Sequence, residues 1–246
     1  MERWWPIEME WMIQERLEAV QARIAEAALA AGRPAEEITL CAATKVQTSE
    51  TIRAAIAAGI TVCGENRVQE LTAHLADGAY AGAEVHFIGH LQRNKVKHVV
   101  GKVDLIQSVD GEELLGLIEK QAGKLEIVQD ILIEVNIGGE ERKSGVTPEM
   151  AHHLAALAGQ MAHVRLRGLM AIPPVSTREG ENRRFFAAMR QLYVDITEKK
   201  YDNESNMDVL SMGMSGDFAD AILEGATLVR VGTALFGPRP ANRAHG

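Results

Sequence analysis

The 246-residue sequence has few of the features that mark secreted or membrane proteins. It has only two cysteines, Cys41 and Cys63, and both lie inside apolar runs, which excludes a disulfide framework and favours reduced core residues. The first residues include tryptophans, but acidic Glu8 and Glu10 follow in place of a sustained apolar region, so we expect no signal peptide. No stretch approaches the ~18 apolar residues of a membrane span. These absences predict a soluble, cytoplasmic protein.

Excess positive charge is also missing, because the formal net charge is −8 with acids and bases interspersed. Such a chain has no long-range attraction to nucleic acid or to an anionic membrane, and we expect neither as a partner. One basic segment, from Arg93 to Lys102, could attract anions, but a run of this kind is usually a solvated helix face.

Several catalytic motifs are absent as well. No G-x-G-x-x-G follows a predicted strand, and there is no Walker glycine–lysine loop. The segment Gly213-Met214-Ser215-Gly216 is not a nucleophile elbow, because Asp217 stands where the motif needs glycine. His86 and His90 have a metal-ligand spacing, but Gly89 interrupts the segment between them, so we expect the pair to diverge and predict no metal.

What the sequence does contain is a regular alternation of short apolar runs and amphipathic segments. The runs predict eight buried strands. They are 38–45, 60–63, 84–88, 104–107, 130–136, 164–169, 207–210 and 227–231. Helices are expected between them, with a leading helix over 11–31 and a basic helix over 91–100. Start signals are Ser49, the capping box of Asp110 with Glu113, and Thr147-Pro148.

Strands that alternate with helices predict an α/β protein with a parallel sheet. Eight such units in about 250 residues favour a single closed (β/α)8 barrel, with an extra N-terminal helix, over a doubly wound sheet. No Gly/Ser-rich linker or composition shift marks a second domain, so the prediction is one barrel domain over 1–246, with 1–10 as a loose segment.

Lys45 is the main candidate for chemistry. It closes the first strand, and an ammonium buried there loses its proton more readily because burial disfavours the charged form. A neutral amine can attack a carbonyl and form a Schiff base. The alternative is a strand-end lysine whose amine reaches solvent.

A phosphate site is predicted across the barrel mouth from Lys45. The loops after strands seven and eight are the usual phosphate position in this architecture, and glycines there let the backbone approach an anion. A helix beginning near Ser215 would add its positive dipole end. A ligand with both a carbonyl and a phosphate is implied, either pyridoxal 5′-phosphate or a sugar phosphate. The hydroxyl and glycine residues of these two loops are Ser211, Gly213, Ser215, Gly232 and Thr233.

Seven segments together resemble the pyridoxal-phosphate homeostasis protein family, whose fold resembles the N-terminal barrel of alanine racemase (fold-type III). They are Ala42-Ala43-Thr44-Lys45, Gly64-Glu65-Asn66-Arg67-Val68-Gln69-Glu70, the 86–95 run HFIGHLQRNK, Lys143-Ser144-Gly145, the 167–173 run RGLMAIP, the 210–215 run LSMGMS and the 229–237 run VRVGTALFG. They span nearly the whole chain in the family's order.

The resemblance implies that Lys45 forms a Schiff base with pyridoxal 5′-phosphate and that Ser211, Gly213, Ser215, Gly232 and Thr233 hold the phosphate. It places Arg230 at the pyridine nitrogen and lines the ring with Asn66, His86 and Asn94. An arginine donates to the nitrogen without protonating it, which limits carbanion chemistry. Departures from the family's pattern are Thr44 for serine, Arg67 for an aromatic residue and Gly216 for an acidic residue.

The function that the resemblance implies is to hold and exchange pyridoxal 5′-phosphate in vitamin B6 and amino-acid homeostasis, without established turnover. Apo forms of enzymes that use this cofactor are the expected partners, and a monomer is the expected state. The alternative is an amino-acid racemase, which would need a second domain with a catalytic tyrosine; Tyr193 and Tyr201 are poor substitutes. A third reading is a class I aldolase-like enzyme, which would use Lys45 without an arginine at a pyridine.

Overall fold

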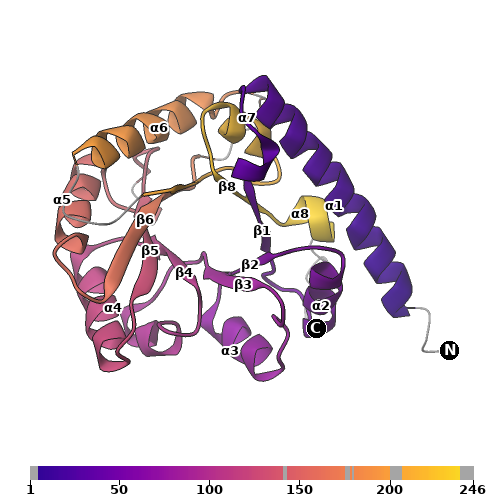
Figure 1. Ribbon diagram of the computed structural model, residues 1–246, viewed down its shortest axis with the longest axis horizontal. Helices are drawn as coiled ribbons and strands as arrows, with labels where there is room; N and C mark the ends of the chain where they lie inside the picture. Colours follow the sequence, from indigo (N-terminus) through magenta and orange to yellow (C-terminus); the bar gives the residue numbers. More distant parts are fainter. Residues whose placement is uncertain (1–4, 141–142, 175–177, 179, 200–206, 239–246) are drawn as a thin grey trace, which may run out of the picture.

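The computed structural model describes residues 5–140, 143–174, 178, 180–199 and 207–238. Its centre is one closed barrel of eight strands in the order β1 to β8, with every neighbouring pair parallel, and the helices surround it (Figure 1). The strands are β1 (Thr39–Ala43), β2 (Val62–Glu65), β3 (Glu84–Phe87), β4 (Leu105–Val109), β5 (Gln129–Val135), β6 (Val164–Ala171), β7 (Val209–Ser211) and β8 (Leu228–Val231). The predicted (β/α)8 barrel is confirmed.

The helices follow the predicted alternation. They are α1 (Trp5–Ala30), α2 (Ser49–Ala57), α3 (Val68–Ala76), α4 (Glu112–Lys124), α5 (Pro148–Ala158), α6 (Arg183–Glu198), α7 (Phe218–Leu223) and α8 (Thr233–Phe236), with 3₁₀ turns η1 (Ala35–Glu37) and η2 (Arg93–His98). Thr147 caps α5 with proline at its first position, as predicted, because its hydroxyl accepts the Met150 N–H. In the described residues, no helix combines the length and apolarity that crossing a bilayer requires.

The extra helix α1 completes the outer ring of helices. The helix after β8, α8, has only four residues and cannot cover the barrel wall by itself. The long α1 packs against α2, α7 and α8 and covers this part of the wall (Figure 1). Its buried face includes Ile13, Leu17, Val20 and Ile24, which recur at helical spacing. The helix begins at Trp5, so most of the segment expected to be loose is helical.

Three apolar clusters hold the barrel together. The largest lies between the outer face of the strands and the helices. Inside the barrel are two small apolar clusters, one around Cys41, Val62 and Leu228 and one around Leu105, Leu132 and Met170. Both cysteines are free and buried, as predicted. Because successive residues of a strand point alternately inward and outward, membership of an inner or outer cluster shows which side chains of each strand point into the barrel.

Three local predictions were wrong. The basic segment expected to be an α-helix over 91–100 is the short 3₁₀ turn η2. Helix α2 is capped by the Thr48 hydroxyl rather than by Ser49, which is already its first helical residue. The capping box at α4 does not form, because Gly111 takes the N-cap position and the Asp110 carboxylate lies 3.0 Å from His90 Nδ1 instead.

Candidate functional site

Lys45 lies at the carboxyl-end mouth of the barrel, two residues beyond the end of β1. Cys41 and Ala43 point into the barrel, so the two-residue alternation puts Lys45 on the inner side as well, and it is half-buried there. The next residue, Val46, has a φ of 59°, which is unusual for a β-branched residue, and its N–H donates to Glu70 Oε2 at 3.1 Å. Such strained backbone tends to occur at functional sites.

A buried polar network behind Lys45 fixes the end of β1. Glu65 is fully buried, and its Oε1 accepts from Thr44 Oγ1 at 2.6 Å and from Tyr80 Oη at 2.8 Å. His74 Nδ1 lies 3.2 Å from the same carboxylate oxygen. Burial, and then the Glu65 charge, raise the pKa of Tyr80, so the phenol keeps its proton and donates. Thr44 is thereby held in place directly before Lys45.

The loops after β7 and β8 meet at a set of backbone donors. The N–H groups of Gly232 and Ala234 both donate to Ser215 Oγ, at 3.2 and 3.3 Å. These donors lie at the start of α8, which includes Thr233. The helix after Ser215, α7, begins at Phe218, and the converging N–H groups belong to the β8 loop rather than to α7. In this structure Ser215 Oγ accepts both N–H groups, at a position where an oxygen of an anion could take its place.

Gly213 allows this loop to pack tightly against α7. Its φ is +90°, and an added Cβ would lie 2.6 Å from Ala221 Cβ and 2.9 Å from Phe218 Cα. The Gly213 carbonyl accepts the N–H of Arg230 at 3.0 Å, which ties the β7 loop to β8. A side chain here would push the two loops apart.

We therefore expect Gly213→Ala to lower the free energy of unfolding by about 2–3 kcal/mol, because it adds both a clash and an unfavourable φ. The matched control is Gly216→Ala three residues later, where an added Cβ meets nothing within 4 Å. The control should change stability by less than ~0.5 kcal/mol. Urea unfolding of both variants measures the difference; equal stabilities would contradict the close approach at Gly213.

Arg230 points into the barrel from β8 and is almost fully buried. Its Nη1 donates to Ser211 Oγ at 2.5 Å, and its Nη2 donates to the Ala171 carbonyl at 2.8 Å. Burial lowers its pKa, whereas Cys41 and Glu134 raise it. The guanidinium still remains a donor, since an arginine is not deprotonated in proteins. The structure thus places Ser211 against Arg230. The predicted contact of Ser211 with a phosphate stays a prediction.

Glu134 is a site residue that sequence reasoning missed. It lies near the end of β5 and points inward because Leu132, two residues earlier, belongs to an interior cluster. Burial, followed by Asp110, raises the pKa of Glu134 to about 7, and Arg230 lowers it. A carboxyl with this pKa can exchange a proton at neutral pH.

The raised pKa predicts a pH-dependent stability. Between about pH 4.5 and pH 7 the folded protein retains a proton that the unfolded chain has released, so stability falls as the pH rises through this range. Glu134→Gln stays neutral and should be more stable above pH 7, by up to roughly 3 kcal/mol, but not at pH 4. Urea unfolding across this pH range tests it, with exposed Glu10→Gln as the control. An equal gain at every pH would point to packing rather than charge.

The three residues expected to line the ring lie in different places. Asn66 follows β2 at the Lys45 side of the barrel; it is half-buried, and its Oδ1 is a buried atom with no hydrogen-bond partner in the described residues. An added Cβ at Gly89 would come within 2.1 Å of the Asn66 carbonyl, so the two loops are in close contact. Asn94 is exposed on η2 and lines a groove with Asp110 and Glu113.

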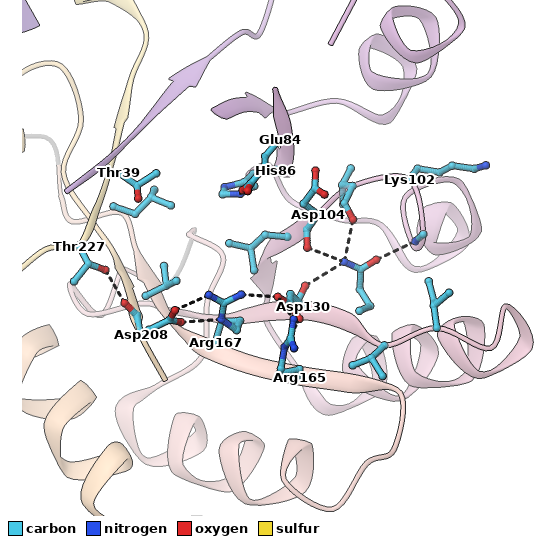
Figure 2. A pocket seen from close by; sticks show the side chains of 18 of the residues that line it. Thr39, Glu84, His86, Lys102, Asp104, Asp130, Arg165, Arg167, Asp208 and Thr227 are labelled. Carbon is cyan, nitrogen blue, oxygen red and sulfur yellow. Dashed lines mark hydrogen bonds and ion pairs between the residues drawn. The ribbon is translucent and has the colours of Figure 1, made fainter. Parts of the chain in front are cut away.

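His86 faces the opposite mouth of the barrel. It lines a cavity of about 800 Å³ at the amino ends of the strands, where Arg167 bridges Asp130 and Asp208 and Arg165 also pairs with Asp130 (Figure 2). Its Nδ1 lies 2.9 Å from Gln107 Nε2 inside the barrel. Burial lowers the pKa of His86 to about 4, so the ring is neutral at pH 7.

The carboxyl-end mouth thus supplies an amine, a set of anion donors and a guanidinium. This donor set fits a ligand with an aldehyde, a phosphate and a ring nitrogen, and the partnerless Asn66 Oδ1 is a further group that a ligand could satisfy. A sugar phosphate would use the amine and the anion donors but would leave Arg230 without a role.

Known proteins are similar to this chain over almost all of its length. The family model "Alanine racemase, N-terminal domain" matches residues 16–240. A pyridoxal phosphate homeostasis protein from Aquifex aeolicus is 45% identical over 92% of this chain and 97% of its own. The structure of PipY from Synechococcus elongatus with pyridoxal phosphate bound is 32% identical, with a TM-score of 0.79, over 92% of this chain and 100% of that one. An alanine racemase from Clostridium difficile shares the fold at 14% identity and a TM-score of 0.71, over 94% of this chain and 57% of its own.

Proposed function

Since the chain belongs to the pyridoxal phosphate homeostasis protein family, we propose that it holds and exchanges pyridoxal 5′-phosphate at the carboxyl-end mouth of its barrel. The observation that carries the proposal is the meeting of three groups there: the half-buried amine of Lys45, the converging N–H groups of the β8 loop, and the buried guanidinium of Arg230. The structure of a relative with this ligand bound supports it.

Each group has a separate task in this proposal. Lys45 condenses with the aldehyde of the ligand, and its neighbours Thr44 and Val46 hold its backbone in place. The N–H groups of Gly232 and Ala234 hold the phosphate, with Ser215 and Thr233 beside them. Arg230 donates a hydrogen bond to the ring nitrogen. Asn66 lines the ring, and Glu134 holds or releases a proton close by.

The bound cofactor supplies an electron sink for carbanion chemistry, and an unprotonated ring nitrogen makes that sink weak. Arg230 keeps the nitrogen unprotonated because a guanidinium donates a hydrogen bond but holds its protons too tightly to transfer one. The described tyrosines are also occupied: Tyr80 donates to Glu65, and Tyr193 donates to the Met207 carbonyl at 2.6 Å. Tyr201 lies outside the described residues. These features favour a binding protein over a racemase.

The proposal extends to how the ligand moves. A binder without turnover delivers its cargo, so apo forms of enzymes that use pyridoxal 5′-phosphate are the proposed recipients, within the cytoplasm. A monomer suffices for this role, because each group named above comes from one chain.

Absorbance spectroscopy tests the proposal directly. Protein mixed with pyridoxal 5′-phosphate should turn yellow, and borohydride should fix the ligand to one residue. Peptide mass mapping should find the modification on Lys45. A protein that stays colourless with excess cofactor, or that is modified only on other lysines, would exclude the proposal.

Assays with alanine and other amino acids should also show negligible racemisation by the loaded protein. The physical reason is the unprotonated ring, together with the engagement of both described tyrosines, Tyr80 and Tyr193, in other hydrogen bonds. Chiral chromatography of the products measures this. Steady multiple turnovers would favour the racemase alternative instead.

A further inference from the structure

A chain of buried polar side chains crosses the barrel from Arg230 to the opposite mouth. Arg230 Nη1 donates to Ser211 Oγ at 2.5 Å, and Ser211 Oγ donates to Gln107 Oε1 at 2.6 Å. Gln107 Nε2 lies 2.9 Å from His86 Nδ1. The four residues come from β8, β7, β4 and β3, and none is more than 4% exposed.

The direction of hydrogen-bond donation along these four residues is fixed by Arg230. A guanidinium can only donate, so Ser211 accepts from Arg230 and has its own proton left to give. The acceptor for that proton is Gln107 Oε1. The opposite orientation of the Gln107 amide would turn N–H groups toward Ser211 and leave the hydroxyl proton without an acceptor in a buried site, which is costly.

The other end of the chain is therefore defined as well. Gln107 donates its Nε2–H to His86, so His86 Nδ1 must carry the lone pair and Nε2 must carry the proton. Nε2 faces the cavity at the amino-end mouth and lies 3.6 Å from Glu84 Oε2, which is too long for a hydrogen bond (Figure 2).

The charges around His86 do not overcome its burial. Asp104 and Asp130 raise its pKa and Arg167 lowers it, while Glu84 lies nearby on its own strand. Both aspartates already accept from other groups, Asp104 from the Val85 N–H and Asp130 from the two arginines. A neutral ring is thus consistent with the donor role of Gln107.

Four polar side chains inside an apolar barrel carry a desolvation cost that apolar packing would avoid. We propose that Gln107 and His86 are positioning residues of the cofactor site. Through Ser211 they fix the orientation of the Arg230 guanidinium that faces the ring nitrogen. The contact between Arg230 and the ring nitrogen rests on the proposed function, whereas the direction of the hydrogen bonds from Arg230 to His86 does not.

The first experiment determines the direction of these hydrogen bonds without any cofactor. Long-range ¹⁵N–¹H correlation spectra of protein labelled at its eight histidines report the tautomer of each ring. The His86 signal is identified by its loss in His86→Gln. In the wild type it should show a neutral ring protonated on Nε2. In Gln107→Glu a carboxylate replaces the donor, and the proton should appear on Nδ1.

The second experiment measures pyridoxal 5′-phosphate binding. Gln107→Met keeps the volume but removes the hydrogen bonds of Gln107 with Ser211 and His86. We therefore expect about tenfold weaker binding and a shifted visible band. Gln107→Glu still accepts from Ser211 and should recover part of the affinity. The control is Gln160→Met in the exposed turn just after α5, which should bind like the wild type. Circular dichroism and thermal unfolding confirm that each variant is folded.

The outcomes separate the two proposals. A wild-type His86 protonated on Nδ1, or a folded Gln107→Met with unchanged affinity and spectrum, would overturn the positioning role. A wild type that binds no pyridoxal 5′-phosphate would refute the proposed function, while the His86 tautomer would still decide the direction of the chain. If Gln107→Met does not fold, the His86 tautomer in Gln107→Glu and the affinity of that variant decide the matter.

Discussion

Replacing Lys45 with alanine should abolish the yellow colour and the borohydride-stable product, and should weaken pyridoxal 5′-phosphate binding by at least about 100-fold. The anion donors of the β8 loop and the Arg230 guanidinium would remain, so weak non-covalent binding should persist. The loss is large because the covalent bond to the amine cannot be replaced by another group at the end of β1. Absorbance titration and mass spectrometry after reduction measure it.

Two further variants show whether the reactive amine or the positive charge matters. Lys45→Arg keeps the charge but cannot form the bond, and it should be as colourless as the alanine variant. Lys124→Ala removes an exposed lysine at the end of α4 and should behave as the wild type. All three should unfold at nearly the wild-type urea concentration, because Lys45 is only half-buried. Retained colour in a folded Lys45→Ala would assign the bond to another lysine.

The barrel could be predicted from the sequence because its strands are short apolar runs with clear breaks between them. The failures arose where local patterns competed with tertiary contacts. The 91–100 segment has many basic residues and few apolar ones at helical spacing, and it forms only the 3₁₀ turn η2. Asp110 has the sequence of a capping box, but its carboxylate lies against His90 on a neighbouring loop.

At the site, Lys45, Arg230 and the two glycine-containing loops could be identified because strand ends and glycines are visible in the sequence. Glu134 and Gln107 could not, because both lie within strands that read as apolar. Their inward direction depends on strand register, which shifts between Ile106 and Val109 and again between Ile131 and Leu132. His86 was expected at the ring, yet the register turns its free nitrogen toward the opposite mouth.

Replacing Arg230 should affect both the fold and the ligand. Arg230→Met leaves the Ala171 carbonyl without its donor and Ser211 without the first member of its chain. Unpaired buried groups of this kind cost about 3 kcal/mol in the free energy of unfolding. The pKa of Glu134 should also rise further, because Arg230 is the group that lowers it. The exposed pair of Arg53 with Asp77 gives a control, since Arg53→Met should cost less than about 1 kcal/mol.

The spectrum of the bound ligand distinguishes the role of the guanidinium from a general loss of stability. Arg230→Glu would place a carboxylate where the donor stands, and a carboxylate favours a protonated ring nitrogen, whereas Arg230→Met favours neither state. The visible band should therefore differ between the two variants, although both are less stable than the wild type. Combining Arg230→Glu with Glu134→Gln removes the repulsion between two buried carboxylates and should restore part of the lost stability. Two folded variants with the wild-type band would remove Arg230 from contact with the ligand.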